Sequence, residues 1–154
     1  MTKDEFGALA HGKAFERDYR GRKIELSTIN KTDAGLLKLM DGVIGYVSGK
    51  ARVVIHCLWE ATGHVAKSQH YLGKACDFHL EPLQKMSYVE QIGLVEEALE
   101  NLDATYRVGL GIYPTWNHRG FHVDTRGTRA RWGYLGKEPV AFETALKFAI
   151  EKGL

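Results

Sequence analysis

His70 and Asp77, a histidine and an aspartate seven positions apart, have the residue types and the spacing that suit a metal site. Gly73 lies between them and permits a turn that brings His70 back over a following strand. On that strand Ala75 and Asp77 share one face, because side chains alternate with period two. His122, in a short later strand, offers a third ligand. Two nitrogens and one carboxylate leave a fourth tetrahedral position for water, which is typical of a catalytic rather than a structural zinc ion.

The composition of the chain is typical of a small globular protein. Its 154 residues, 44% of them hydrophobic and 26% charged, predict one domain over 1–154, with 1–31 as a weakly patterned N-terminal arm. The net charge of +2 gives no argument for a polyanionic partner. No apolar run approaches the ~20 residues that span a bilayer, and the polar start lacks the apolar core of a signal peptide. We therefore expect a monomer that is cytoplasmic as synthesised and does not insert into a membrane.

The two cysteines, Cys57 and Cys76, are too few to form a disulfide framework. Both flank strand-like runs. We interpret them as reduced, buried, small apolar groups.

Hydrophobic periodicity and capping residues predict the elements that must position these side chains. Thr32 or Asp33 can cap a helix that continues to Val47, and Ser87 with Glu90 forms a capping box for a second helix. We expect strands at 51–57, 74–80, 105–113 and 120–124, and an edge strand or extended arm at 23–27. We expect a basic loop at 126–136 and a last helix from Pro139. This order predicts an α+β fold, a small, mainly antiparallel sheet with helices packed on it.

The stretch from Ser68 to Asp77 resembles the S-x-H-x-x-G-x-A-x-D motif of the zinc D-alanyl-D-alanine carboxypeptidases. Relatives of that family include phage L-alanyl-D-glutamate endolysins, the vancomycin-resistance dipeptidase and the hedgehog signalling domain. The later segment 111–132, with its G-F-H-V-D strand followed by arginines and a tryptophan, is similar to the branch whose third ligand lies in an F-V-H-x-D strand. The resemblance covers roughly 50–135.

The resemblance implies a hedgehog/DD-peptidase-like fold, with His70, Asp77 and His122 as the ligands of a Zn²⁺ ion. It implies that Ser68 hydrogen-bonds the turn or a ligand. It also implies hydrolysis of peptidoglycan peptides by metal-activated water, in the manner of an endolysin or a DD-carboxypeptidase. An enzyme of the phage type would act on the cell wall after its release from the cell.

The acidic residue that serves as general base in several relatives is missing from this chain. Several relatives have an acid three residues before the last ligand, where this chain has Arg119, which cannot act as a base. Asp124 points to the same strand face as His122, and His118 lies in the loop just before it. We take these two as the candidate catalytic residues, with His79 or Glu60 as further alternatives. Asp124 can equally serve to orient a histidine ligand.

The substrate contacts also differ from those of the family. Many relatives carry an arginine after the strand that precedes the motif, but residues 56–60 of this chain contain none. Arg126, or Arg52, can replace it, unless Arg126 belongs to a solvated loop. Trp59 and Trp116 can form the wall of a peptide groove.

Two alternatives to a peptidase follow from these departures. One is a module that retains zinc and binds cell-wall peptides without turnover. The other is a nucleic-acid-binding domain that uses the arginines of the 126–131 loop. Three arginines in a nearly neutral protein make only a small basic patch, so we expect no nucleic-acid partner. The peptide bond cleaved, the wall chemotype and the phage or cellular origin do not follow from the sequence.

Overall fold

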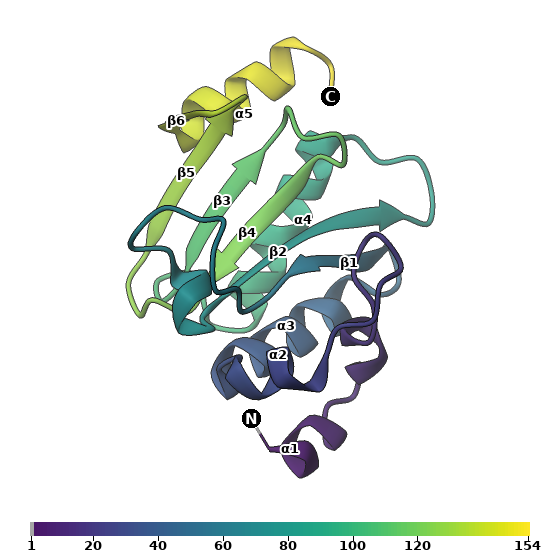
Figure 1. Cartoon of the computed structure of the whole chain (residues 1–154). Coiled ribbons are helices and arrows are strands. Elements are labelled where there is room, and N and C mark those ends of the chain that lie inside the picture. The colour runs from purple at the N-terminus through teal and green to yellow at the C-terminus, as the bar shows by residue number, and fades with distance from the viewer. Residues whose placement is uncertain (1) are drawn as a thin grey trace.

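The protein is built on a six-stranded sheet, seen here in a computed structural model that describes residues 2–154 (Figure 1). Met1, which belongs to both the predicted domain and the predicted N-terminal arm, lies outside the described residues. The spatial order of the strands is β1 (Ala51–Cys57), β2 (Ala75–Pro82), β4 (Gly120–Asp124), β3 (Gly109–Tyr113), β5 (Ala130–Leu135) and β6 (Glu138–Ala141). All neighbouring strands are antiparallel except β3 and β5. The predicted α+β class, with a mainly antiparallel sheet, is confirmed.

Two long helices and three shorter ones accompany the sheet. They are α1 (Lys3–Gly7), α2 (Leu26–Lys31), α3 (Ala34–Val47), α4 (Tyr88–Asn101) and α5 (Phe142–Glu151), with 3₁₀ turns η1 (Gly12–Phe15) and η2 (Gln69–Leu72). The predicted starts of α3 and α4 are confirmed. The side chain of Asp33 accepts a hydrogen bond from the backbone N–H of Leu36, and Ser87 and Glu90 form the reciprocal capping box.

The two faces of the central strands differ in chemistry. Phe78, Phe121, Leu110 and Ile112 are fully buried in the apolar core that also includes residues of α3 and α4. The alternate residues of the same strands point to the opposite face, and in the central β2–β4 pair they include Asp77, which lies directly opposite His122. Strand alternation therefore separates the apolar core from the polar face that carries the predicted ligands.

Four predictions of secondary structure were wrong. The strand expected at 105–113 begins only at Gly109, because residues 105–107 form a turn. Residues 23–27 form no named strand: only Lys23 makes an isolated bridge, to Arg17, and Leu26 already begins α2. The predicted loop at 126–136 contains β5, which pairs in parallel with β3. Pro139 lies in β6 instead of starting a helix, and α5 begins at Phe142. Because β6 is an edge strand, a proline is tolerated there. No helix within the described residues is both long and apolar enough to cross a membrane.

Candidate metal centre

The three predicted metal ligands meet at one point on the polar face of the sheet. The Nδ1 atom of His122 lies 2.9 Å from Oδ1 of Asp77, and the Nε2 atom of His70 lies 3.1 Å from Oδ2 of the same carboxylate. One ligand atom from each of the three residues falls within 4.8 Å of the others. Both histidines are buried and Asp77 is nearly so. The neighbouring elements η2 and β2 and the distant strand β4 thus bring two imidazoles and one carboxylate together.

The turn that delivers His70 depends on two other residues of the motif. The hydroxyl of Ser68 accepts a hydrogen bond of 3.2 Å from the backbone N–H of His70 and so caps η2. Gly73 ends η2 with a left-handed φ of 68°, and a Cβ atom there would lie 2.1 Å from the carbonyl oxygen of Lys31. Only glycine fits at such a position. The expected role of Ser68, a hydrogen bond to the turn, agrees with this geometry.

The outer nitrogen of each histidine fixes its ring, which leaves the inner nitrogen for a metal. Nδ1 of His70 lies 2.7 Å from the carbonyl oxygen of Leu58, which can only accept, so this nitrogen carries a proton. Nε2 of His122 lies 2.8 Å from Oδ2 of Asp124, which likewise accepts. Nε2 of His70 and Nδ1 of His122 both face Asp77. This donor set, two oriented imidazoles and one carboxylate, fits a zinc ion.

Protonation of the metal-free site shows how strongly its charges interact. Burial alone lowers the pKa of His122, but hydrogen bonds to Asp124 and Asp77 outweigh it and raise the pKa to about 9. Burial raises the pKa of Asp77, yet its hydrogen bonds to His122 and His70 hold it well below the usual range. Without a metal, His122 therefore carries a second proton between two carboxylates, in the place that a cation would take.

Asp124 lies behind His122 and does not face open space. Its side chain is fully buried and accepts hydrogen bonds of 2.7 Å from both Nε and Nη2 of Arg126. This arginine and His122 keep the pKa of the Asp124 carboxyl far below its usual range, against the effect of burial. Gly109 makes room for the pair, because a Cβ atom there would lie 2.7 Å from the carboxylate. Of the two roles that the sequence left open for Asp124, this geometry supports orientation of His122.

Cys57 lies against the candidate metal ligands and is not simply the buried apolar group that the sequence predicts. Its Sγ atom is 3.2 Å from Oδ2 of Asp77 and 4.0 Å from Nε2 of His70. Burial and the Asp77 carboxylate both raise the pKa of the thiol in the metal-free protein. With His64, whose ring stacks on His70 at 4.1 Å, Cys57 forms a second group of potential ligands that shares His70. Cys76, on the core side of the sheet, is fully buried, as predicted.

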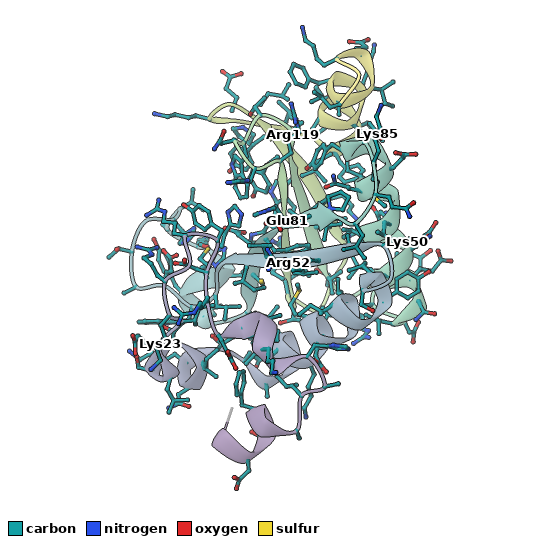
Figure 2. All side chains as sticks on the ribbon, turned by 90° about the vertical axis from the view of Figure 1, so that its right-hand side faces the viewer. Lys23, Lys50, Arg52, Glu81, Lys85 and Arg119 are labelled. Carbon is teal, nitrogen blue, oxygen red and sulfur yellow. The ribbon has the colours of Figure 1, made fainter. Side chains whose placement is uncertain are left out.

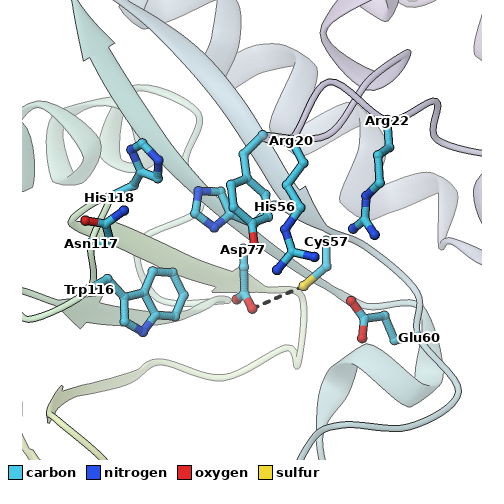
Figure 3. A pocket seen from close by; sticks show the side chains of 10 residues that line it. Arg20, Arg22, His56, Cys57, Glu60, Asp77, Trp116, Asn117 and His118 are labelled. Carbon is cyan, nitrogen blue, oxygen red and sulfur yellow. Dashed lines mark hydrogen bonds between the residues drawn. The ribbon is translucent and has the colours of Figure 1, made fainter.

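A pocket of about 620 Å³ opens over Asp77 (Figure 3). His118, predicted as a candidate base, and Trp116, predicted as a substrate contact, lie in its wall. Its lining is otherwise polar and comes largely from β1 and from the N-terminal arm: Tyr19, Arg20, Arg22, His56, Cys57, Glu60, Asp77 and Asn117. A cavity of this size accommodates a short peptide.

Trp59, Arg126 and Arg52 are not among the pocket-lining residues. Trp59 packs under the ammonium group of Lys31, 4.1 Å from the ring centroid. Arg126 is held by Asp124 and lies over the ring of Trp132. Arg52 pairs with Glu81 at 2.6 Å (Figure 2). None of the three lines the pocket over Asp77, so their contact with a substrate stays a prediction.

The contribution of the N-terminal arm to the pocket is not predicted by the sequence pattern. Tyr19, Arg20 and Arg22 enter the pocket from the arm over 1–31 that the sequence predicts to be weakly patterned. The available signal was turn chemistry, since an aspartate at position 18 followed by a glycine at position 21 is typical of a tight turn. Which part of the fold that turn would touch did not follow from the pattern.

Comparisons of the chain with family models, with curated proteins and with solved structures found no match.

Proposed function

We propose that the protein is a zinc-dependent peptidase that cleaves the peptides of bacterial peptidoglycan, in the manner of an endolysin or a DD-carboxypeptidase. The observation that carries the proposal is the orientation of His70 and His122. Each uses its outer nitrogen for a hydrogen bond and turns its inner nitrogen toward Asp77, at the floor of an open polar pocket. The resemblance of residues 68–77 and 111–132 to the zinc carboxypeptidases supports the substrate class.

A zinc ion held by His70, Asp77 and His122 would supply a Lewis acid that polarises the scissile carbonyl and lowers the pKa of water. The protein holds these ligands rigidly through Leu58 and Asp124. Such outer partners are as much a part of a metal site as the ligands themselves.

Proton transfer requires a group that reaches the pocket, and Glu60 and His118 meet this condition. Glu60 lies beside Cys57 in the pocket wall (Figure 3), and its Oε2 atom is 3.4 Å from Nε2 of His64. His118 stacks on His79 at a centroid distance of 4.5 Å, farther along the wall. We assign the proton transfer to Glu60, with His118 as the alternative, and assign Asp124 to the orientation of His122.

The proposal is tested by zinc analysis and digestion of purified peptidoglycan. We expect one equivalent of zinc and release of peptides by the wild type, and loss of both for His122→Ala. His11→Ala is a matched control, because His11 packs against Gly45 on α3, away from the site. Zinc at one equivalent without released peptides from any wall chemotype would refute the peptidase.

One observation favours a second candidate function, a zinc-retaining module that binds cell-wall peptides without turnover. The Cys57 thiol lies at hydrogen-bonding distance from Asp77 (Figure 3), and as a thiolate it would fill the position that hydrolysis must keep open. Cobalt-loaded protein distinguishes the two. Sulfur-to-cobalt charge-transfer absorption that disappears in Cys57→Ser but persists in Cys76→Ala, together with wall binding and no hydrolysis, would establish the module.

A further inference from the structure

Residues 16–24 of the N-terminal arm form a tight hairpin whose tip is strongly ordered by hydrogen bonds. The backbone N–H of Asp18 donates to the carbonyl of Arg22 at 2.8 Å, and that of Gly21 donates to the carbonyl of Asp18 at 2.9 Å. One carboxylate oxygen of Asp18 accepts from the backbone N–H groups of both Arg20 and Arg22, at 2.8 and 3.0 Å. Gly21 takes a φ of 75°, which suits glycine. The tip therefore has a defined shape although it is exposed.

Tyr19 fixes this tip against the pocket. Its ring stacks on His56 of β1 with a centroid distance of 4.1 Å and an interplanar angle of 15°, and meets His118 edge-on at 6.2 Å. On its other side the His56 ring stacks on Trp116 at 5.6 Å. Stacked aromatic contacts of this kind hold the hairpin over the wall that faces Asp77.

The two arginines of the tip differ in what they contact. Nε of Arg22 pairs with the Asp18 carboxylate at 2.8 Å. The Arg20 guanidinium has no carboxylate partner among the described residues. It lies 5.1 Å from the Tyr19 ring centroid and points into the pocket (Figure 3). The tip thus presents one guanidinium whose hydrogen-bond donors are free.

The charge of the pocket favours an anion once a metal is bound. The lining carries two cationic side chains, Arg20 and Arg22, and two carboxylates, Asp77 and Glu60. A divalent ion at Asp77 adds two positive charges to this balanced set. An anionic group is therefore attracted, and the planar fork of a guanidinium matches a carboxylate with two parallel hydrogen bonds.

We propose that Arg20 binds a free carboxylate on the peptide residue next to the cleaved bond, and so selects peptides that carry that group. The inference rests on the proposed function for the identity of the peptide. Its geometric basis is the hairpin. The Asp18 carboxylate shapes the tip through hydrogen bonds, the Tyr19 ring stacks against β1, and the left-handed φ of Gly21 allows the turn. The wall that recognises the substrate then comes from the N-terminal arm, whereas the metal ligands come from η2 and the sheet.

The test is a binding measurement by calorimetry on zinc-loaded protein, with N-acetyl-D-alanyl-D-alanine and its C-terminal amide as probes. We expect the acid to bind tighter than the amide by roughly 10- to 100-fold, the range for hydrogen bonds to a charged group. Arg20→Ala should reduce this preference to a few-fold, and Arg20→Lys should retain part of it, because an ammonium keeps the charge but not the fork. Lys23→Ala is the matched control: it removes a positive charge from the same hairpin at a residue that does not line the pocket (Figure 2).

Three results would overturn the inference: equal binding of acid and amide to the wild type, an acid preference that Arg20→Ala leaves intact, or no binding of either probe. Zinc content, measured on every variant, should stay at the wild-type value, because Arg20 contacts none of the proposed ligands. Binding that depends on Arg20 without cleavage of the acid would support the anion site and refute the DD-carboxypeptidase form of the proposed function. Cleavage of the acid, with an acid preference that Arg20→Ala leaves unchanged, would refute the anion site and support the peptidase.

Discussion

Replacing Asp124 by asparagine separates its two candidate roles. In the native site the carboxylate accepts a hydrogen bond of 2.8 Å from Nε2 of His122 and two of 2.7 Å from Arg126. Asparagine keeps the size of the side chain but has only one acceptor oxygen, which cannot serve both partners fully. If Asp124 orients His122, the variant should lose metal affinity first and activity as a consequence.

The magnitude follows from the burial of the pair. Loss of a partner that orients a metal-bound histidine costs about 10- to 100-fold in metal affinity, or about 1.4 to 2.7 kcal/mol. Breaking a fully buried ion pair destabilises a protein by about 3–5 kcal/mol. Arg126 keeps 33% of its side-chain surface exposed and can be hydrated, so we expect a smaller loss here. The free energy of unfolding of metal-free Asp124→Asn should fall by about 2 kcal/mol.

Zinc affinity should be measured by competition with a chelator near pH 9, where the second proton of His122, with its pKa of about 9, no longer dominates metal binding. At lower pH the variant gains affinity through a lowered pKa of His122, which would mask part of the loss. Arg126→Gln, which leaves the carboxylate in place, should have a smaller effect. Unchanged zinc affinity in Asp124→Asn, together with a fall in turnover of about 10²-fold or more, would identify Asp124 as the base and refute the orienting role.

Three further results are expected. The pKa of His122 is raised to about 9, so its second proton is bound below that pH and a metal must displace it. The logarithm of zinc affinity should therefore rise by about one unit per pH unit from about pH 7 to 9 and then level off. A flat profile would contradict the proton assignment. Gly73→Ala should destabilise the protein by about 2 kcal/mol or more in chemical denaturation, because φ is 68° and a carbonyl oxygen blocks the Cβ, while Gly49→Ala, with no atom near its Cβ, should be nearly neutral. Glu60→Gln should lower turnover by about 10²-fold or more at unchanged zinc content, and a larger loss in His118→Ala would transfer the proton-transfer role to His118.

Part of the possible metal-binding cluster could be predicted because its geometry follows from local rules. Strand alternation places Asp77 on one face of β2, and the turn at Gly73 returns His70 to that face. The opposition of Asp77 and His122 depends on the register between β2 and β4, which the pattern of either strand alone does not specify. The helix starts at Asp33 and Ser87 are equally local, because a capping side chain bonds a backbone N–H three residues away.

The surroundings of the site could not be predicted because they depend on long-range packing. The stack of Tyr19 on His56 joins residues 37 positions apart, counted from 19 to 56, and nothing in either segment specifies the other. β5 was taken for a loop because its pairing with β3 is parallel and non-local. The proximity of Cys57 to Asp77 arises from a register shift in the β1–β2 pair between Ile55 and Cys57. A bulge of this kind re-aims a side chain without a signature in the sequence pattern.

X-ray absorption at the zinc edge of the zinc-loaded protein tests the central claim most directly, because it reports the atoms that bind the metal. We expect a coordination shell of nitrogen and oxygen only, at about 2.0–2.2 Å, with the outer-shell scattering of two imidazoles. Sulfur at about 2.3 Å would place Cys57 in the shell and contradict an open site for hydrolysis. The absence of bound zinc would contradict the metal centre itself.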